Sequence, residues 1–248
     1  MPIISQSKYL VNAGWDDVPH LDDLTKAELF EATPPYLRDA RTKGIPSLGS
    51  GAIYPVMESE IACDPFEIPA YWPRCYGFDV GWKKTAAIWG AWDRDDDIVY
   101  IYTEHYRGLA EPAIHAAAIN ARGDWIPGVI DPASRGRGQA DGEMLFESYE
   151  GLGLTLDKAN NAVEGGIHQV WSRLSTGRLK IFNTCQNFFA EYRLYRRNEN
   201  GKVIKEFDHL MDATRYMIAS GLDVAEVQPI NRDSFTTRPH AGDPVAGY

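Results

Sequence analysis

Three strand-like segments in a row, joined by short polar turns, constrain the fold of this chain more than any other feature. Residues 75–80, 85–92 and 98–106 are rich in β-branched and aromatic residues, and the turn at residues 93–97 consists of Asp and Arg alone. Consecutive strands with connections this short pair in antiparallel fashion. The sequence therefore predicts a three-stranded antiparallel meander.

Helical and strand-like segments alternate after the meander. Helices are predicted at residues 111–122, 143–150, 166–174 and 187–196, and short strands at 125–131, 154–156 and 179–182. A last helix is expected over residues 208–220, ended by Gly221. Because βα units add parallel strands and cover a sheet with helices, the predicted fold class is α/β, with a mixed sheet and helices on both faces.

Composition divides the 248 residues into three parts. Residues 1–70 are rich in Asp and Pro, carry short helical segments at 26–32 and 36–41, and are predicted to form an extended, partly helical arm. Residues 71–223 are the predicted folded domain, and residues 224–248 are predicted to be a flexible tail. Neither a signal peptide nor a run of about 18 apolar residues is found, so no membrane association is expected.

Three aspartates occupy positions where a core-building sequence would normally place an apolar residue. Asp79 ends the first strand of the meander, Asp131 ends an apolar run, and Asp212 lies inside the last helix. Burying a lone carboxylate costs several kcal/mol unless a partner or a cation compensates for it. Carboxylates without a His–Cys cluster suit Mg²⁺ or Mn²⁺, and two such ions commonly carry out phosphodiester hydrolysis.

Each of these aspartates also has a purely structural interpretation. Asp79 and Asp131 precede turn-forming residues, and either could simply begin a turn. Asp212 lies three residues before Arg215, so the two could form an ion pair on an exposed helix face. The residues alone leave both interpretations open for all three positions.

Further candidates for the same site lie close by in the sequence. Asp208 and His209 precede Asp212 by four and three residues and share its side of a helix, so either could be an accessory ligand. Glu104, in the third strand, and Glu111, at the next helix start, are weaker candidates for a fourth carboxylate.

A basic segment interrupts a chain that is otherwise acidic. The formal net charge of −10 argues against a protein coated with basic residues, yet residues 171–205 hold eight basic residues against two acidic ones. A solvated helix face would have the same composition, but a polyanion could also bind there. The candidate DNA-contacting residues are Arg173, Arg178, Lys180, Arg193, Arg196 and Arg197.

Three segments together resemble the nuclease domain of the large terminase subunit of tailed bacteriophages. They are residues 78–81 (Phe-Asp-Val-Gly), residues 129–132 (Val-Ile-Asp-Pro) and the helix at 208–216. The most specific piece is His-x-x-Asp-Ala-x-Arg-Tyr at residues 209–216. Residues 38–54 also resemble the linker between the packaging ATPase and the nuclease, so the resemblance spans roughly residues 30–220.

The resemblance implies a ribonuclease H-like fold and a metal-dependent endonuclease that cuts concatemeric duplex DNA with little sequence specificity. It further implies two divalent ions, Mg²⁺ or Mn²⁺, held by Asp79, Asp131 and Asp212. Asp79 would be the ligand shared by both ions, and His209 would lie next to this set. Implied partners are viral double-stranded DNA, the ATPase domain, the small terminase subunit and the portal or procapsid, in the host cytoplasm. Since no G-x-x-x-x-G-K-[ST] motif is present, the translocating ATPase is not expected in this chain.

Two alternatives belong to other functional classes. Asp79-Val-Gly81 followed by Thr85 resembles the phosphate loop of actin-like sugar kinases, in which Asp131 would act as a base. That family requires a duplicated domain, for which this chain is too short. A non-catalytic domain that docks onto a portal or procapsid is the second alternative, and it leaves the three aspartates unexplained.

Overall fold

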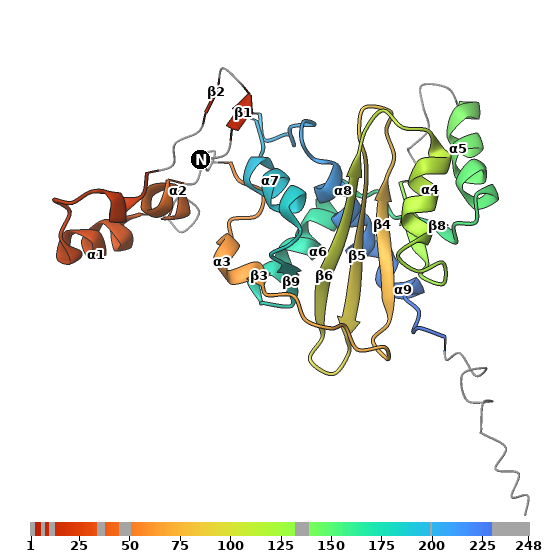
Figure 1. The fold of residues 1–248 in the computed structure, drawn as a ribbon, viewed down its shortest axis with the longest axis horizontal. Coiled ribbons are helices and arrows are strands. Elements are labelled where there is room, and N and C mark those ends of the chain that lie inside the picture. Colours follow the sequence, from red (N-terminus) through yellow and green to blue (C-terminus); the bar gives the residue numbers. More distant parts are fainter. Residues whose placement is uncertain are drawn as a thin grey trace, which may run out of the picture.

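A seven-stranded mixed sheet is the centre of the part of the chain that the structure describes (Figure 1). The structure is a computed structural model, and it describes residues 3–5, 8–9, 13–33, 38–44, 51–131, 139–198 and 200–229. The strands lie in the order β3-β9-β6-β5-β4-β7-β8. Their bounds are Ala62–Cys63 (β3), Arg74–Asp79 (β4), Thr85–Asp93 (β5), Ile98–Arg107 (β6), Gly128–Ile130 (β7), Leu156–Lys158 (β8) and Leu179–Phe182 (β9).

The predicted meander is confirmed. Strand β5 pairs in antiparallel fashion with both β4 and β6, with Asp79 opposite Ala86 and Thr85 opposite Arg107. The other ladders, which involve β3, β7, β8 and β9, are parallel. Strands joined by short polar turns are thus antiparallel, and strands joined by helical crossovers are parallel. This is the mixed sheet that the α/β prediction expected.

Helices cover both faces of the sheet (Figure 1). One face carries α4 (Pro112–Asn120) and α5 (Gln139–Gly151), and the other carries α6 (Val163–Ser175), α7 (Gln186–Leu194) and α8 (His209–Tyr216). Successive residues of β5 serve the two cores in turn: Ile88 packs into the α6–α8 side and Trp89 into the α4–α5 side. This alternation explains why the strand reads as an unbroken apolar run.

The N-terminal segments differ in how they relate to the sheet. The first elements are β1 (Ile3–Ser5), β2 (Lys8–Tyr9), η1 (Trp15–Asp17), α1 (Asp23–Ala32) and α2 (Arg38–Lys43), and in Figure 1 α1 and α2 lie away from the sheet. Asp22 caps α1, since its carboxylate accepts a hydrogen bond from the Thr25 N–H at 2.7 Å. The helical segments predicted in the arm are therefore present.

Residues 53–63 differ from the expectation of an arm outside the core. Ile53, Tyr54 and Ile61 are buried in the α6–α8 core, and after α3 (Glu58–Ile61) the chain adds the edge strand β3. Strand β3 has only two residues, too few for a recognisable alternation of polar and apolar positions. The sequence therefore gave no signal that this segment joins the sheet.

The last helix does not end at Gly221 as predicted. After α8 the chain continues through a π-helical segment, η3 (Met217–Gly221), and one turn of helix, α9 (Leu222–Val224). Gly221 keeps helical dihedral angles, and a Cβ there would lie 3.2 Å from Sγ of Cys75. Its small size serves close packing against β4 and not helix termination. Residues 230–248, most of the predicted tail, lie outside the described residues.

Within the described residues, none of the helices combines the length and the apolar character that crossing a bilayer requires.

Two buried histidines connect β6 to α4. Nε2 of His105 lies 2.9 Å from Nδ1 of His115, so one ring donates a hydrogen bond to the other. Burial, reinforced by the neighbouring His115, lowers the pKa of His105 from 6.5 to about 4, and burial also lowers the pKa of His115. Both rings are consequently neutral in the folded chain near pH 7.

The free energy of unfolding should fall in acid because of this pair. A lowered folded-state pKa gives stability that is present above pH 6.5 and is lost as the pH falls towards about 4. For His105 the shift corresponds to roughly 3 kcal/mol. Denaturant unfolding at pH 7 and pH 4.5 should show a smaller acid loss in His105→Gln than in wild type. His168→Gln, at an exposed position, is the control and should lose as much stability in acid as wild type. Equal losses of stability in wild type and His105→Gln would contradict the role of the buried histidine pair.

Candidate metal centre

Two of the three predicted aspartates leave the sheet side by side. Strands β4 and β7 are parallel neighbours, with Phe78 opposite Ile130, and Asp79 and Asp131 are the next residue on each strand. The N–H of Asp131 donates to the Phe78 carbonyl at 3.4 Å, which keeps the two chains together to this point. Since neighbouring strands are about 4.8 Å apart, both carboxylates start from the same short stretch of the sheet edge.

The third aspartate reaches this edge because α8 lies unusually close to β4. A Cβ on Gly77 would lie 1.9 Å from the carbonyl oxygen of Ala213, so only glycine permits this approach. Gly166 of α6 has a similar role on the side of α8 that faces away from β4, where a Cβ would lie 2.4 Å from Cγ of Arg215. The helix is therefore held between two glycines, and Asp212 is placed beside the end of β4.

The three carboxylates act on one another electrostatically. Burial raises the pKa of Asp79, a hydrogen bond with His209 opposes that rise, and the charges of Asp212 and Asp131 add to it. The distance from Nδ1 of His209 to Oδ2 of Asp79 is 2.8 Å, and this contact in turn raises the pKa of His209. Asp79 and His209 are thus in direct contact, and the charges of Asp131 and Asp212 act on Asp79.

Protein cations hold both oxygens of Asp212. Arg215 lies 3.1 Å from Oδ1, and Lys205 lies 2.7 Å from Oδ2. Lys205 is also 3.1 Å from Oδ2 of Asp208, close enough for an ion pair although the angles do not make a hydrogen bond. Of the described residues, no three His, Cys, Asp or Glu side chains converge closely enough to enclose one ion in these rotamers.

The chemistry of the donor set nevertheless fits a divalent cation. Asp79, Asp131 and Asp212 supply hard oxygen ligands from three different elements, which suits Mg²⁺ or Mn²⁺. Mutual repulsion of the carboxylates contributes to the raised pKa of Asp79, and a cation between them would relieve it. His209 and Asp208 lie close enough to orient or extend this set.

The two weaker carboxylate candidates lie at helix N-termini and not in this group. Glu104 accepts hydrogen bonds from the N–H groups of Asn187 at 2.9 Å and Phe188 at 2.8 Å, so it caps the start of α7. Glu111 is the N-cap residue of α4 and is exposed. The favourable interaction of a carboxylate with a helix N-terminus explains both positions.

Of the basic segment at 171–205, Lys205 reaches the carboxylates, but the six candidate DNA-contacting residues do not converge on them. Five of the six candidate side chains bind protein acceptors. Arg173 and Arg178 both bind Asp97. Lys180 binds the Glu60 carbonyl, Arg193 binds Glu58, and Arg197 binds Glu164. Arg196 forms a backbone bridge with Ala52. Asp97 lies in the turn beyond the far end of β5, whereas Asp79 faces its start, so roughly 25 Å of strand separates them.

Sequence reasoning missed a buried glutamate that positions α8. Glu191 of α7 is 2% exposed and accepts hydrogen bonds from the Tyr106 hydroxyl at 2.7 Å and from the Leu210 N–H at 2.6 Å. Burial raises its pKa. Leu210 lies between His209 and Asp212, so this contact fixes the first turn of the helix that carries both. A charged residue among the aromatic positions of α7 was the only sequence signal.

Truncation of Glu191 should destabilise the chain because it leaves a buried N–H and a buried hydroxyl unsatisfied. We expect Glu191→Ala to lower the free energy of unfolding by about 2–3 kcal/mol in denaturant unfolding at pH 7. Tyr106→Phe removes one of the two contacts and should cost less. The exposed Glu150 is a matched control, and an Ala substitution there should change little; similar losses at 150 and 191 would argue against the anchoring role.

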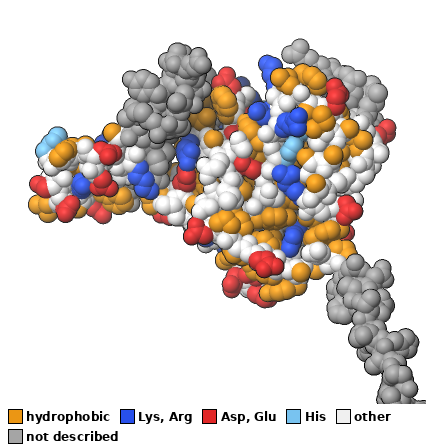
Figure 2. All heavy atoms as spheres, viewed as in Figure 1, with side chains coloured by type: hydrophobic (Ala, Val, Ile, Leu, Met, Phe, Trp, Pro, Cys, Tyr) orange, Lys and Arg blue, Asp and Glu red, His pale blue; other side chains and the backbone are white. Residues whose placement is uncertain are grey.

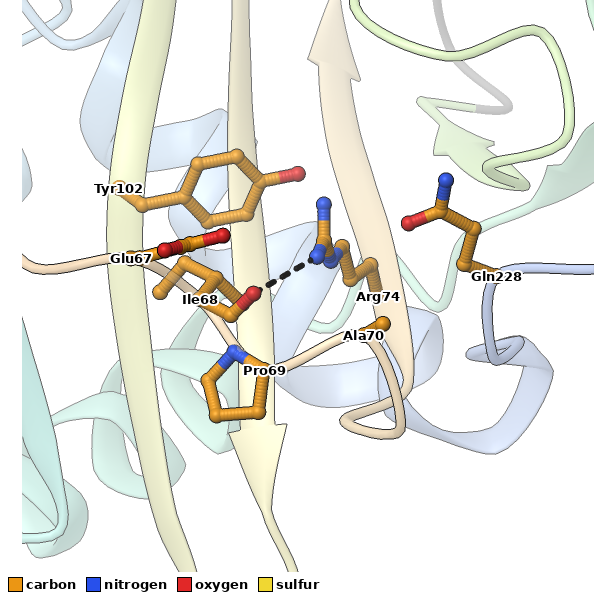
Figure 3. A pocket seen from close by; sticks show the side chains of 7 residues that line it. All are labelled: Glu67, Ile68, Pro69, Ala70, Arg74, Tyr102 and Gln228. Carbon is orange, nitrogen blue, oxygen red and sulfur yellow. Dashed lines mark hydrogen bonds between the residues drawn. The ribbon is translucent and has the colours of Figure 1, made fainter.

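A pocket of about 490 Å³ lies at the other end of β4 (Figure 3). The Arg74 side chain lies within it, beside Tyr102, and donates a hydrogen bond to the Ile68 carbonyl at 3.2 Å. Gln228 lines its opposite side. Arg74 begins β4 and Asp79 ends it, so this pocket is separate from the carboxylates.

Comparison with known proteins bears on what this carboxylate group is for. The sequence pattern described as "Terminase RNaseH-like domain" matches residues 76–220. The large terminase subunits of Enterobacteria phage LP7 and Salmonella phage P22 are each 34% identical to the chain over 223 aligned positions, and each match covers 86% of the chain. The chain spans 46% and 44% of the length of these curated relatives.

Solved structures agree with the sequence match. The nuclease domain of the P22 large terminase superimposes with a TM-score of 0.68 at 33% identity, over 73% of this chain and 96% of that one. The large terminase nuclease of thermophilic phage G20c, solved with bound cobalt, shares the fold with a TM-score of 0.51 at 15% identity, over 70% and 99% of the two chains. The chain therefore belongs to the terminase RNase H-like domain family, and its mixed sheet is the ribonuclease H-like fold that the resemblance implied.

Proposed function

We propose that this chain is the endonuclease part of a viral DNA-packaging terminase and that it cuts concatemeric duplex DNA by two-metal phosphodiester hydrolysis. The observation that carries the proposal is that Asp79 and Asp131 leave neighbouring strands side by side and that the charges of Asp131 and of Asp212, on α8, both act on Asp79. Membership in the terminase family and the bound cobalt of the G20c nuclease support it.

Asp79, Asp131 and Asp212 would hold two divalent ions, Mg²⁺ or Mn²⁺, with Asp79 shared between them. Such ions supply the Lewis acidity and the activated water that phosphodiester hydrolysis needs. The protein's own contribution is to orient the carboxylates before substrate arrives. His209 holds one oxygen of Asp79, and Arg215 holds one oxygen of Asp212. Both contacts reduce the reorganisation that the site requires when DNA binds.

Duplex DNA would be held through its phosphates by cations near this sheet edge. Lys84 and Arg107 lie there, because Thr85 and Arg107 are paired one step beyond Asp79 and Ala86. Figure 2 shows Lys and Arg side chains gathered in a column over the central strands. Phosphate contacts carry no base information, so we expect little sequence specificity and an affinity that falls steeply with salt. The six candidate basic residues between Arg173 and Arg197, most of them paired, would make only outlying contacts.

The wider setting follows from the relatives. Since this chain spans less than half of the large terminase subunits it matches, the ATPase domain, the small subunit, the portal or procapsid and a host-cytoplasmic location are proposed from them. Residues 1–70 would include the linker from the ATPase. The sugar-kinase alternative rested on Asp79–Thr85 and Asp131, and the terminase family match covers these residues. Nothing in the described part of the chain favours a purely docking role.

Cleavage should depend entirely on a divalent ion. Supercoiled plasmid incubated with the chain and Mn²⁺ should be relaxed and then linearised, and excess EDTA should stop the reaction. We expect the rate to fall by more than about a hundredfold without metal, because the ions supply the nucleophile and stabilise the leaving oxygen. Cleavage that persists in EDTA would contradict the proposal.

A further inference from the structure

An ammonium group reaches the carboxylates from the loop before α8. Nζ of Lys205 is 2.7 Å from Oδ2 of Asp212 and 3.1 Å from Oδ2 of Asp208. The side chains of both aspartates are about nine-tenths buried, with 10% and 8% exposure, whereas that of Lys205 is 56% exposed. A half-solvated cation therefore neutralises two buried acids at the proposed metal centre.

The two cations that bind Asp212 differ in how easily they could leave. Arg215 is 1% exposed, and Gly166 provides the space that its side chain fills. Removing its partner would strand a buried charge, which is costly. Lys205 could swing into solvent and be rehydrated, and ion pairs to such exposed lysines contribute little. Only the Lys205 contact is therefore readily exchanged.

The loop that carries Lys205 is held up to Ile204, whose N–H donates to the Arg196 carbonyl at 3.0 Å, and residues 205–207 after it are exposed. Phe207 has a φ of +56°, a left-handed conformation that aromatic residues rarely adopt, and its side chain is 57% exposed. Glu206 and Lys202 are exposed as well. Contacts of Lys205 with Asp208 and Asp212 thus help to keep a strained, largely solvated loop against the site.

We propose that Lys205 is a built-in counter-ion that a divalent metal must displace from Asp212 and Asp208. This inference rests on the proposed function, since it assumes that Asp212 binds metal. An ammonium group 2.7 Å from a ligand oxygen repels any second cation at that oxygen, so the two compete. Competition makes metal affinity weaker than the carboxylates alone would give, and it couples metal binding to release of the loop.

Calorimetric titration of the full chain with MnCl₂, without DNA, tests the competition. We expect Lys205→Gln to bind Mn²⁺ about fivefold more tightly than wild type, the largest gain expected from losing a partly exposed ion pair. Lys202→Gln removes the same charge from an exposed position on the same loop and should not change the affinity. Equal or weaker Mn²⁺ binding by Lys205→Gln, with normal binding by wild type, would overturn the role of Lys205 and leave the metal site standing.

Failure of all three proteins to bind Mn²⁺ would instead overturn the proposed function, and the role of Lys205 with it. Wild-type protein offers a second measurement if Lys205→Gln does not fold. Amine-selective labelling followed by mass spectrometry should show Lys205 reacting faster when Mn²⁺ is added, while Lys202 keeps its rate. Unchanged labelling of Lys205 in protein that binds Mn²⁺ would contradict displacement.

Discussion

Asp79→Asn should reduce Mn²⁺-dependent plasmid cleavage by at least about a thousandfold, which corresponds to about 4 kcal/mol in activation free energy. Asp79 ends the central strand β4, and both other carboxylates influence its pKa. The amide is nearly the same size but carries no charge, so it cannot serve as the shared ligand of two ions. Initial rates of plasmid relaxation and calorimetric Mn²⁺ binding should both show the loss.

The fold should survive this change, which separates a catalytic defect from unfolding. Asn can still accept a hydrogen bond from His209, and loss of the charge removes the cost of burial and the smaller repulsion that together raise the pKa of Asp79. Without metal, the melting temperature of Asp79→Asn should therefore be at least that of wild type. Asp93→Asn, at the far end of β5, is the matched control and should cleave normally. Wild-type rates in Asp79→Asn would remove this residue from the site.

Among substitutions that add a single methyl group in this part of the chain, Gly77→Ala should be the most destabilising. The new Cβ would lie 1.9 Å from the Ala213 carbonyl oxygen, which is backbone and cannot rotate away. Helix α8 must then move off β4, and we expect a loss of about 3 kcal/mol or more in the free energy of unfolding. Denaturant unfolding monitored by circular dichroism measures it.

The same change should also weaken Mn²⁺ binding, because Asp212 moves with α8. Gly151→Ala is the control, since a Cβ at the end of α5 meets no atom within 4 Å. That variant should unfold within about 0.5 kcal/mol of wild type. A Gly77→Ala protein as stable as Gly151→Ala would show that α8 does not depend on this contact.

Local pattern predicted much of the architecture. The strands at 75–80, 85–92 and 98–106 could be read because β-formers and polar turns alternate over short distances, and β9 was predicted with its observed bounds. Asp79 and Asp131 could be singled out from the sequence because a carboxylate at the end of an apolar strand is conspicuous. The expectation that strand-end aspartates lie close together agrees with Asp79 and Asp131, which follow paired positions of the parallel neighbours β4 and β7.

What could not be predicted depends on contacts between distant segments. Gly77 and Ala213 are far apart in sequence, so nothing local shows that a helix lies on the strand there. Glu191 reads as an ordinary helical glutamate until Leu210 and Tyr106 are placed against it. The pairing of the basic segment could not be predicted for the same reason, since the acids that bind Arg173, Arg193 and Arg197 lie elsewhere in the chain.

Asp79, Asp131 and Asp212 should bind metal together. A crystal of the chain soaked in MnCl₂, with diffraction recorded at the manganese absorption edge, tests this most directly. We expect one or two anomalous peaks within about 2.5 Å of carboxylate oxygens from all three residues. Peaks elsewhere, or none at this edge of the sheet in crystals that bind manganese, would contradict it.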